Sequence, residues 1–261
     1  MSTLLLTGRG AVVTGGGRGV GAAVARQMAA QGAAVVVASR TISEVQAVAD
    51  DITASGGTAH PICCDVSDAT SVGHLARAAL DTLGHVDVLV NSAGVALAAP
   101  FHRTSLDDWQ RAFAVNATGT FLCMQAFLPA MLERGWGRMV NVASIAALSG
   151  ERYTAAYAAA KHAVLGLTRS VAIEVAGKGV TVNAVCPGFL DTRMTRETID
   201  RIVAATGRDR QSAAEAIAAR NPQQRLITAD EVAAAVLFLC GEHARGINGE
   251  ALVIDGGELR R

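Results

Sequence analysis

The chain alternates short runs of β-branched residues with alanine-rich segments of helical length. The runs are apolar on consecutive positions, as strands buried on both faces of a parallel sheet require. The expected strands cover residues 11–14, 33–38, 58–62, 86–91, 138–142, 180–185 and 251–254. The expected helices cover residues 20–31, 42–55, 69–83, 106–134, 154–176 and 229–240. This alternation predicts an α/β fold, namely a doubly wound Rossmann domain with a seven-stranded parallel sheet and helices on both faces.

Nothing in the sequence divides the 261 residues by a linker, a composition break or a repeat, so a single domain over residues 1–261 is expected. Residues 189–227 are the one interruption of the alternation. They hold two short Arg-rich helical pieces, residues 195–206 and 212–219, separated by Gly207. An insertion after a strand's carboxyl end lies where open α/β sheets bind ligands. The segment is therefore predicted to be a helical substrate lid. A surface insertion with no role in substrate binding would give the same pattern.

Composition narrows the possible partners and the compartment. Hydrophobic residues make up 51% of the chain, and 23 basic residues balance 23 acidic ones, so neither a nucleic acid nor a membrane is expected as a partner. The five cysteines show no CxxC pair and no metal-ligand spacing, which indicates reduced thiols and no metal site. The first ten residues, MSTLLLTGRG, lack a basic n-region, and the apolar run at 32–38 is too short to span a bilayer. A soluble, cytoplasmic protein is expected.

A glycine-rich turn follows the first expected strand. Residues 14–21 read TGGGRGVG and lead directly into a helix. Glycines allow a tight turn and let backbone N–H groups approach a pyrophosphate at the positive helix N-terminus. Gly15, Gly19 and Val20 are therefore predicted to bind a dinucleotide, the alternative being a glycine-rich turn that binds no ligand.

The end of the second expected strand indicates which dinucleotide binds. An acid there accepts a hydrogen bond from a ribose 2′-hydroxyl, whereas a cation pairs with a 2′-phosphate. Ser39 and Arg40 follow the strand directly, no carboxylate occurs until Glu44, and Arg18 in the glycine turn faces the same pocket. NADP(H) is thus favoured over NAD(H). The alternative is that Arg40 is solvated at the strand end.

Tyr157 and Lys161 stand four residues apart in an expected helix, so both side chains project from one face. A phenol ordinarily has a pKa near 10, and a nearby ammonium lowers that pKa. The pair is a candidate acid–base centre. An ordinary pair on a helix surface has the same spacing.

With this glycine turn and this Tyr157–Lys161 pair, the chain resembles the short-chain dehydrogenase/reductase family, and the resemblance covers nearly its whole length. Seven motifs occur in the family's order at strand ends and in the helices that follow. They are the TGxxxGxG turn at 14–21, Asp65-Val66, the turn at 91–94 (Asn91-Ser92-Ala93-Gly94), Asn116, Ser144, Tyr157 with Lys161, and Pro187-Gly188 with Thr192. One departure is Ser92, where the family commonly has a second asparagine; a local adjustment with intact catalysis is expected.

The resemblance implies four catalytic roles. Tyr157 would act as general acid in ketone reduction and as general base in alcohol oxidation. Lys161 would hold the nicotinamide ribose hydroxyls and lower the pKa of Tyr157, and Ser144 would bind the substrate oxygen. Asn116 would position a water in a proton relay from Lys161 to solvent. Alternatively, Ser144 only caps a strand end and Asn116 only pins a helix backbone.

The resemblance also implies the remaining cofactor contacts. The residues that would flank the adenine are Asp65 and Val66. The residues that would form the floor under the adenosine ribose are Asn91, Ala93 and Gly94. The residues that would hold the carboxamide and fix the nicotinamide face are Pro187, Gly188, Leu190 and Thr192.

The substrate is less constrained. The stretches MLERGWGRMVNVAS, GVTVNAVCPGFLDTRM and INGEALVIDGG look most like 3-oxoacyl-thioester reductases and polyketide ketoreductases. Lid arginines could meet a carrier's phosphates, but interspersed acids fit a solvated lid equally well. The lid length also resembles 3-hydroxybutyrate dehydrogenases. Residues 95–98 and 145–148 are apolar, which disfavours a free short hydroxy acid and favours a bulkier apolar ketone.

The sequence therefore predicts NADPH-dependent reduction of a ketone, either a 3-oxoacyl thioester or a polyketide-like apolar ketone, to a secondary alcohol. The alternative enzyme is an NAD-dependent 3-hydroxyacyl or secondary-alcohol dehydrogenase. A non-catalytic nucleotide sensor is disfavoured because the catalytic set is complete. Family resemblance further implies a homotetramer assembled through the helices at 106–134 and 154–176.

Overall fold

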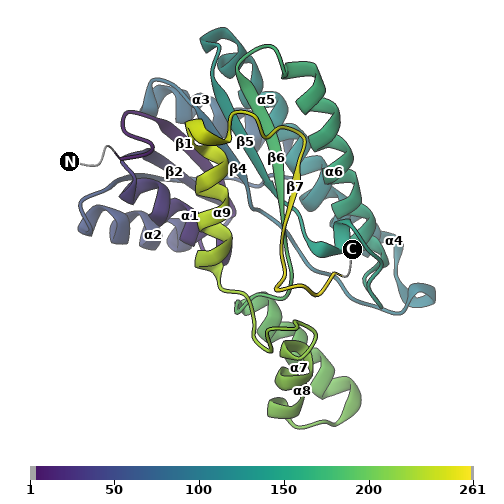
Figure 1. Ribbon diagram of the computed structural model, residues 1–261. Helices are drawn as coiled ribbons and strands as arrows, with labels where there is room; N and C mark the ends of the chain where they lie inside the picture. The colour runs from purple at the N-terminus through teal and green to yellow at the C-terminus, as the bar shows by residue number, and fades with distance from the viewer. Residues whose placement is uncertain (1–3, 260–261) are drawn as a thin grey trace.

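The computed structural model describes residues 4–259; residues 1–3 and 260–261, the ends of the expected domain, lie outside the described part. Its centre is one seven-stranded sheet in the order β3-β2-β1-β4-β5-β6-β7, with every neighbouring pair parallel (Figure 1). The strands are β1 Gly10–Thr14, β2 Ala34–Ser39, β3 Thr58–Cys63, β4 Val88–Asn91, β5 Gly137–Val142, β6 Val180–Pro187 and β7 Ala251–Ile254. The predicted Rossmann-type parallel sheet is confirmed.

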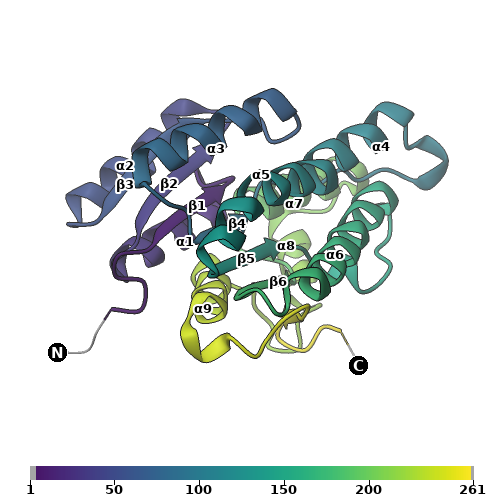
Figure 2. The same ribbon diagram turned by 90° about the horizontal axis from the view of Figure 1, so that it is seen from above.

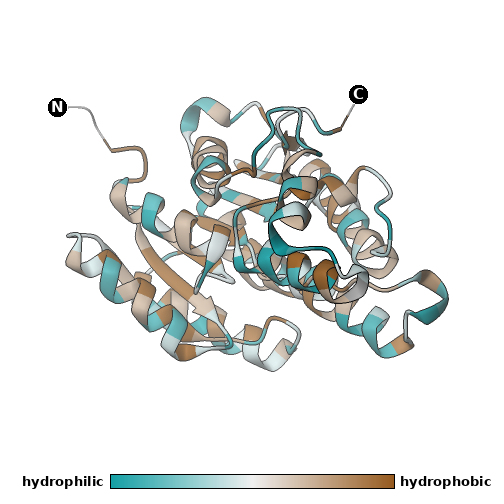
Figure 3. Ribbon diagram, turned by 90° about the horizontal axis from the view of Figure 1, so that it is seen from below, coloured by the Kyte–Doolittle hydropathy of each residue, from teal (hydrophilic) through white to brown (hydrophobic). Residues whose placement is uncertain are grey.

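Helices cover both faces of the sheet. On one face, α1, α2 and α9 pack with Ala11 and Val13 of β1 in one apolar cluster; on the other, α3, α5 and α6 pack with Val12 in a second cluster. Figure 2 shows α3 and α5 on the side of the sheet opposite α9. The helices are α1 Gly19–Ala30, α2 Ile42–Ala54, α3 Ala69–Leu83, α4 Leu106–Phe113, α5 Gly119–Arg134, α6 Ala155–Val175, α7 Arg193–Thr206, α8 Arg210–Ala218 and α9 Ala229–Cys240. The strands are mostly hydrophobic, whereas the surrounding helices also carry hydrophilic residues (Figure 3).

Side-chain caps set several helix ends. The Asp68 carboxylate accepts a hydrogen bond from the Thr70 N–H at 2.9 Å to begin α3, and Gly84 ends that helix in the left-handed conformation at φ 73°. Thr228 and Glu231 form a reciprocal capping box at the start of α9. These local signals explain why the predicted boundaries lie within a few residues of the observed ones.

The prediction of one regular helix over residues 106–134 needs correction. The stretch consists of α4 and α5 joined by a π-helical turn at Ala114–Thr118. The Asn116 side chain donates to the carbonyl of Ala112 at 2.9 Å, which takes the place of a regular backbone partner and widens the turn. Leu106–Arg134 is long and apolar enough for a membrane span, but Cys123, Phe127 and Met131 are buried against the sheet, so core packing accounts for its apolar residues.

Residues 189–227 leave the sheet after β6 as a helical excursion, hereafter the α7–α8 excursion, which projects beyond the strand ends in Figure 1. A parallel bridge between Leu190 and Ile227 closes its base, with hydrogen bonds of 2.9 and 3.0 Å between the two segments. Ile199, Ala213 and Ile217 form a small core of its own. The two predicted helical pieces are observed.

Asp87 ties together the edge of the sheet where the strands begin. Its side chain is fully buried and accepts a hydrogen bond from the Gly10 N–H at 3.1 Å. Arg9, Arg134 and His85 surround the same carboxylate at 3.5, 3.4 and 3.1 Å. The buried carboxylate of Asp87 therefore connects the start of β1, the start of β4 and the end of α5.

We expect Asp87→Asn to lower the free energy of unfolding by about 2 kcal/mol, because the charged hydrogen bonds become neutral ones. Urea denaturation measures this difference. Asp81→Asn on the exposed side of α3 is the matched control and should change stability by less than about 0.5 kcal/mol. Equal effects of the two changes would contradict a role for the buried carboxylate.

Candidate active site

The glycine turn lies directly against the segment that follows β4. Gly15 has φ 65°, and a Cβ placed there would lie 2.7 Å from the backbone N and Cα of Ala93. A side chain at position 15 would thus be excluded by both conformation and space. The structure brings together Gly15 and Ala93, two of the predicted cofactor residues, where the sheet order reverses direction between β1 and β4.

The start of α1 also approaches the segment after β6. Gly19 has φ 54°, and a Cβ there would lie 3.6 Å from the Thr192 side chain. Val20 is buried in the first turn of α1. Pro187 is the last residue of β6, and the Gly188 N–H donates to the carbonyl of Ile254 at 3.0 Å. Leu190 forms the bridge with Ile227 at the base of the α7–α8 excursion. The predicted pyrophosphate and carboxamide segments therefore face each other.

The predicted ribose pocket contains more negative charge than the sequence indicated. Glu44 folds back beside Gly17 and pairs with Arg18 at 3.2 Å. The second cation, Arg40, lies 3.8 Å from the carboxylate of Asp65. Asp65 accepts hydrogen bonds from Ser67, and its pKa is lowered by those bonds and by Arg40, although burial opposes the shift. Ser39 also lies beside the glycine turn, where a Cβ on Gly17 would be 3.2 Å from its Oγ.

The floor under this region is an amide network. The Asn91 amide donates to the Oδ1 of Asn141 at 2.9 Å, and the Asn141 amide donates to the hydroxyl of Thr168 at 2.9 Å. The backbone N–H of Ser92 donates to the Thr14 hydroxyl at 3.2 Å, so the serine that departs from the family pattern is held through its backbone. Val66 packs onto Gly119, where a Cβ would lie 2.7 Å from the valine side chain.

Ser144 and Tyr157 share a side-chain hydrogen bond, and Ser144 also accepts from the Ala146 N–H at 3.1 Å. Ser144 thus caps the short 3₁₀ turn Ile145–Ala147 as well as contacting the tyrosine. Burial raises the pKa of the Tyr157 phenol, and the Ser144 hydrogen bond only partly opposes the increase. The expectation that Lys161 lowers this pKa is not met. The phenol stays protonated at neutral pH, as a general acid must.

Lys161 is nearly fully buried and points between the strands and the tyrosine. Its Nζ donates to the Val142 carbonyl at 2.8 Å and lies 5.8 Å from the centroid of the Tyr157 ring. Burial lowers the pKa of Lys161 itself to about 8.

Asn116 reaches the same region from the π-helical turn. It is fully buried, its amide donates to the carbonyls of Val95 and Ala112, and its Oδ1 accepts from the Val95 N–H at 3.2 Å. Asn116 therefore pins the helix backbone. A Cβ on Gly94 would lie 2.9 Å from this Oδ1 and 3.7 Å from the Nζ of Lys161. The absence of a side chain at Gly94 keeps the space between the two polar groups open.

The arrangement fits a nicotinamide dinucleotide. Gly15 and Gly19 form a cradle that side chains would fill, in front of the N-terminus of a twelve-residue helix, and two guanidinium groups flank the second strand's end. Within residues 4–259, no group of three or more His, Cys, Asp or Glu side chains is placed to hold a metal ion.

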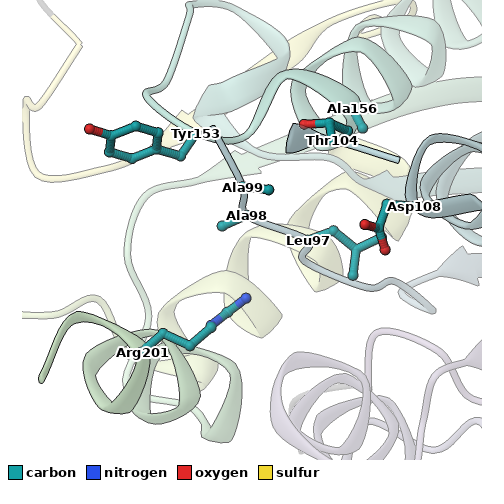
Figure 4. A pocket seen from close by; sticks show the side chains of 8 residues that line it. All are labelled: Leu97, Ala98, Ala99, Thr104, Asp108, Tyr153, Ala156 and Arg201. Carbon is teal, nitrogen blue, oxygen red and sulfur yellow. The ribbon is translucent and has the colours of Figure 1, made fainter. Parts of the chain in front are cut away.

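A small open pocket of about 90 Å³ lies beside Ala156, the neighbour of Tyr157 in α6 (Figure 4). Its lining residues are Leu97, Ala98, Ala99, Thr104, Asp108, Tyr153, Ala156 and Arg201. Tyr153 has φ 66°, which is rare for a bulky residue, and its carbonyl accepts from the Ala99 N–H at 2.7 Å. Sequence reasoning missed Thr104, Asp108 and Tyr153 as pocket residues, because each comes from a loop or helix whose partner is distant in the chain.

Comparison with known proteins agrees with this geometry. Residues 15–258 match a family model described as Enoyl-(Acyl carrier protein) reductase. A 3-oxoacyl-[acyl-carrier-protein] reductase of Synechocystis is 39% identical, with 97% of each chain covered. A D-beta-hydroxybutyrate dehydrogenase of Rhizobium meliloti is 35% identical, over 95% of this chain and 97% of the relative. The crystal structure of F189W actinorhodin polyketide ketoreductase with NADPH has a TM-score of 0.93 at 34% identity, covering 96% of this chain and 97% of that one.

The fold and site define a nicotinamide-dependent oxidoreductase. The chain belongs to the short-chain dehydrogenase/reductase family and resembles its ketoreductases, as the sequence predicted. It is an NAD(P)-dependent enzyme that acts on hydroxyl or ketone groups.

The buried ammonium of Lys161 should cost stability. Its pKa falls from 10.5 to about 8, so the protonated side chain destabilises the fold by about 3 kcal/mol at pH 7, of which its hydrogen bond recovers about 1. We expect Lys161→Met to raise the free energy of unfolding by about 2 kcal/mol at pH 7 while abolishing activity.

The pH dependence tests the cause. Between pH 8 and 10.5 the unfolded chain holds the Lys161 proton and the folded chain does not, so wild-type stability rises with pH through that window. The difference in the free energy of unfolding between Lys161→Met and the wild type should therefore be smaller at pH 9.5 than at pH 7, as measured by denaturation curves at the two pH values. A gap independent of pH would contradict the explanation.

Proposed function

We propose that the protein reduces a ketone to a secondary alcohol with NADPH, using Tyr157 as general acid. The observation that carries the proposal is the hydrogen-bonded pair of Ser144 and Tyr157 above buried Lys161, beside a mostly apolar pocket. The bound nicotinamide would supply the hydride to the carbonyl carbon. The favoured substrates are 3-oxoacyl thioesters and bulky apolar ketones, in keeping with the Synechocystis and actinorhodin relatives.

Ser144 and Tyr157 would both hydrogen-bond to the substrate oxygen. As negative charge develops on that oxygen, the Ser144 hydroxyl stabilises it and the Tyr157 hydroxyl donates its proton. Because burial raises the pKa of the phenol, almost every Tyr157 carries its proton at neutral pH. The products are the alcohol, the oxidised nicotinamide and a tyrosinate.

Lys161 would then restore the phenol. Its pKa of about 8 lies below that of Tyr157, so transfer of a proton from the ammonium to the tyrosinate is favourable. The open space beside Gly94 lies between Lys161 and Asn116, where a water would continue the relay toward solvent. Burial thus places the pKa of Lys161 below that of Tyr157, as the return of a proton to the tyrosinate requires.

A second candidate reaction is NAD-dependent oxidation of a secondary alcohol. Arg18 and Arg40 each already face a carboxylate, Glu44 and Asp65, which compete with a 2′-phosphate. The hydroxybutyrate dehydrogenase relative fits this direction. We favour NADP(H) because both guanidinium groups are more than half exposed and free to turn to a phosphate.

The α7–α8 excursion would serve as the substrate lid. Arg220 at its end pairs with both Glu151 and Glu258, which fixes that end to the loop before α6 and to the C-terminal segment. We also propose a homotetramer in the cytoplasm, since Phe121 of α5 and Ile173 of α6 expose apolar surface on the helices expected at the subunit contacts.

Tyr157→Phe should lower kcat for ketone reduction by about a thousandfold, because the proton donor is lost while the ring remains. Cofactor affinity, followed by fluorescence titration, should stay near the wild-type value. Tyr153→Phe is the matched control: it removes the chain's other phenol hydroxyl and should change kcat far less. Turnover that survives Tyr157→Phe would refute the mechanism.

Arg40→Asp should shift the cofactor preference. A carboxylate at this position repels a 2′-phosphate and accepts from a 2′-hydroxyl, so the ratio of kcat/KM with NADPH to that with NADH should fall by at least about tenfold. Arg77→Asp, a charge change on the exposed side of α3, should leave the ratio unaltered. A wild type that prefers NADH, or an unchanged ratio in Arg40→Asp, would favour the second candidate.

A further inference from the structure

Arg201 differs from most of the arginines in the α7–α8 excursion because its charge is not balanced. Carboxylates pair with five of the others, in the contacts Arg193–Glu197, Arg196–Asp191, Arg210–Asp200, Arg220 with Glu151 and Glu258, and Arg225–Glu231. Arg201 instead donates to the carbonyl of Glu197 at 3.2 Å and to the hydroxyl of Thr198 at 3.0 Å, both neutral. In the described part of the chain, no carboxylate forms an ion pair with it.

The unbalanced guanidinium faces the pocket. Arg201 is one of the pocket's lining residues and extends from α7 toward the segment Leu97 to Ala99 (Figure 4). Apart from Arg201 and Asp108, the lining side chains carry no charge. A substrate that enters the pocket therefore meets one cation at the mouth, on the side opposite Ala156 and the catalytic helix α6.

Asp108 lines the same pocket but forms no ion pair with Arg201 in the described part of the chain. Its carboxylate accepts from the Ser105 hydroxyl at 2.9 Å and lies in the first turn of α4, where the helix N-terminus stabilises negative charge. Asp108 thus has partners of its own, while the free donors of Arg201 remain directed at the pocket.

We propose that Arg201 recognises an acidic group on the substrate, at the end remote from the reacting ketone. A guanidinium offers paired N–H donors that match a carboxylate, a sulfonate or a phosphate. The inference rests on the proposed function, since it names the substrate class of the same site. The apolar residues 95–98 and 145–148 disfavour an acid buried beside the reacting ketone but leave the opposite end of the pocket open to one. The acid would lie at the pocket mouth and keep part of its hydration.

The experiment compares ketones that differ only in charge. We would measure kcat/KM with NADPH for 4-acetylbenzoate and the neutral 4-acetylbenzamide, and likewise for 3-acetylbenzoate and its amide. A second pair, a 3-oxobutanoyl phosphopantetheine thioester and the same thioester without the phosphate, distinguishes a carrier's phosphate from an acid group of the substrate itself. The proteins are the wild type, Arg201→Gln, Arg201→Lys and Arg208→Gln.

We expect the kcat/KM of the wild type to be about tenfold higher for the charged member of at least one pair. This ratio is in the lower range for a charged hydrogen bond, because Arg201 is exposed. Arg201→Gln should bring that preference close to one, mainly through KM, and Arg201→Lys should keep part of it. Arg208, another exposed arginine of the excursion without an ion pair in the described residues, lies outside the pocket, so Arg208→Gln should retain the full preference.

Binding measured without turnover separates this inference from the proposed function. Calorimetric titration of the enzyme–NADP⁺ complex with the same pairs reports Kd even if no ketone is reduced. Loss of the charge preference in Arg201→Gln supports the site whatever the reaction proves to be. Equal Kd and kcat/KM for charged and neutral members in the wild type, or a preference that survives Arg201→Gln, would overturn it. Reduction of neutral ketones would still support the proposed function in that case.

Discussion

A parallel sheet buried on both faces governs this molecule. Each strand must be followed by a crossover through a helical layer, so all seven strands end at the same edge. The glycine turn after β1, the Asn91–Gly94 turn after β4 and Ser144 after β5 are therefore neighbours although they are far apart in sequence. The opposite edge is fastened by the buried carboxylate of Asp87, away from the chemistry.

Burial also sets the chemistry at that edge. It lowers the pKa of Lys161 to about 8 and raises that of Tyr157, and both shifts oppose the stability of the charged forms. The outcome is an acid that holds its proton at neutral pH next to a group that can return one. At neutral pH only the shift of Lys161 lowers the stability of the fold, because the Tyr157 phenol is protonated in both the folded and the unfolded chain.

The α7–α8 excursion completes the site from outside the sheet. Its base is closed by the Leu190–Ile227 bridge, and its return segment after α8 is held by Arg220 against Glu151 and Glu258. Between these two attachments, Arg201 is carried over the apolar pocket. This arginine-rich segment thus places at the pocket one arginine that has no ion pair in the described residues, whereas Arg193, Arg196 and Arg210 pair with carboxylates of the segment itself.

The sequence by itself determined the parallel sheet, the glycine turn and the placement of Tyr157 and Lys161 on one helix face, because these follow from local periodicity and from residues at strand ends. Only the tertiary structure decided the π-helical turn at Asn116, the raised pKa of Tyr157, the return of Glu44 to Arg18 and the position of Arg201 at the pocket. Each of these depends on distances or on desolvation between segments that meet only after folding. Spacing along the chain encodes which side chains share a face, whereas burial and long-range contact set their charge and their partners.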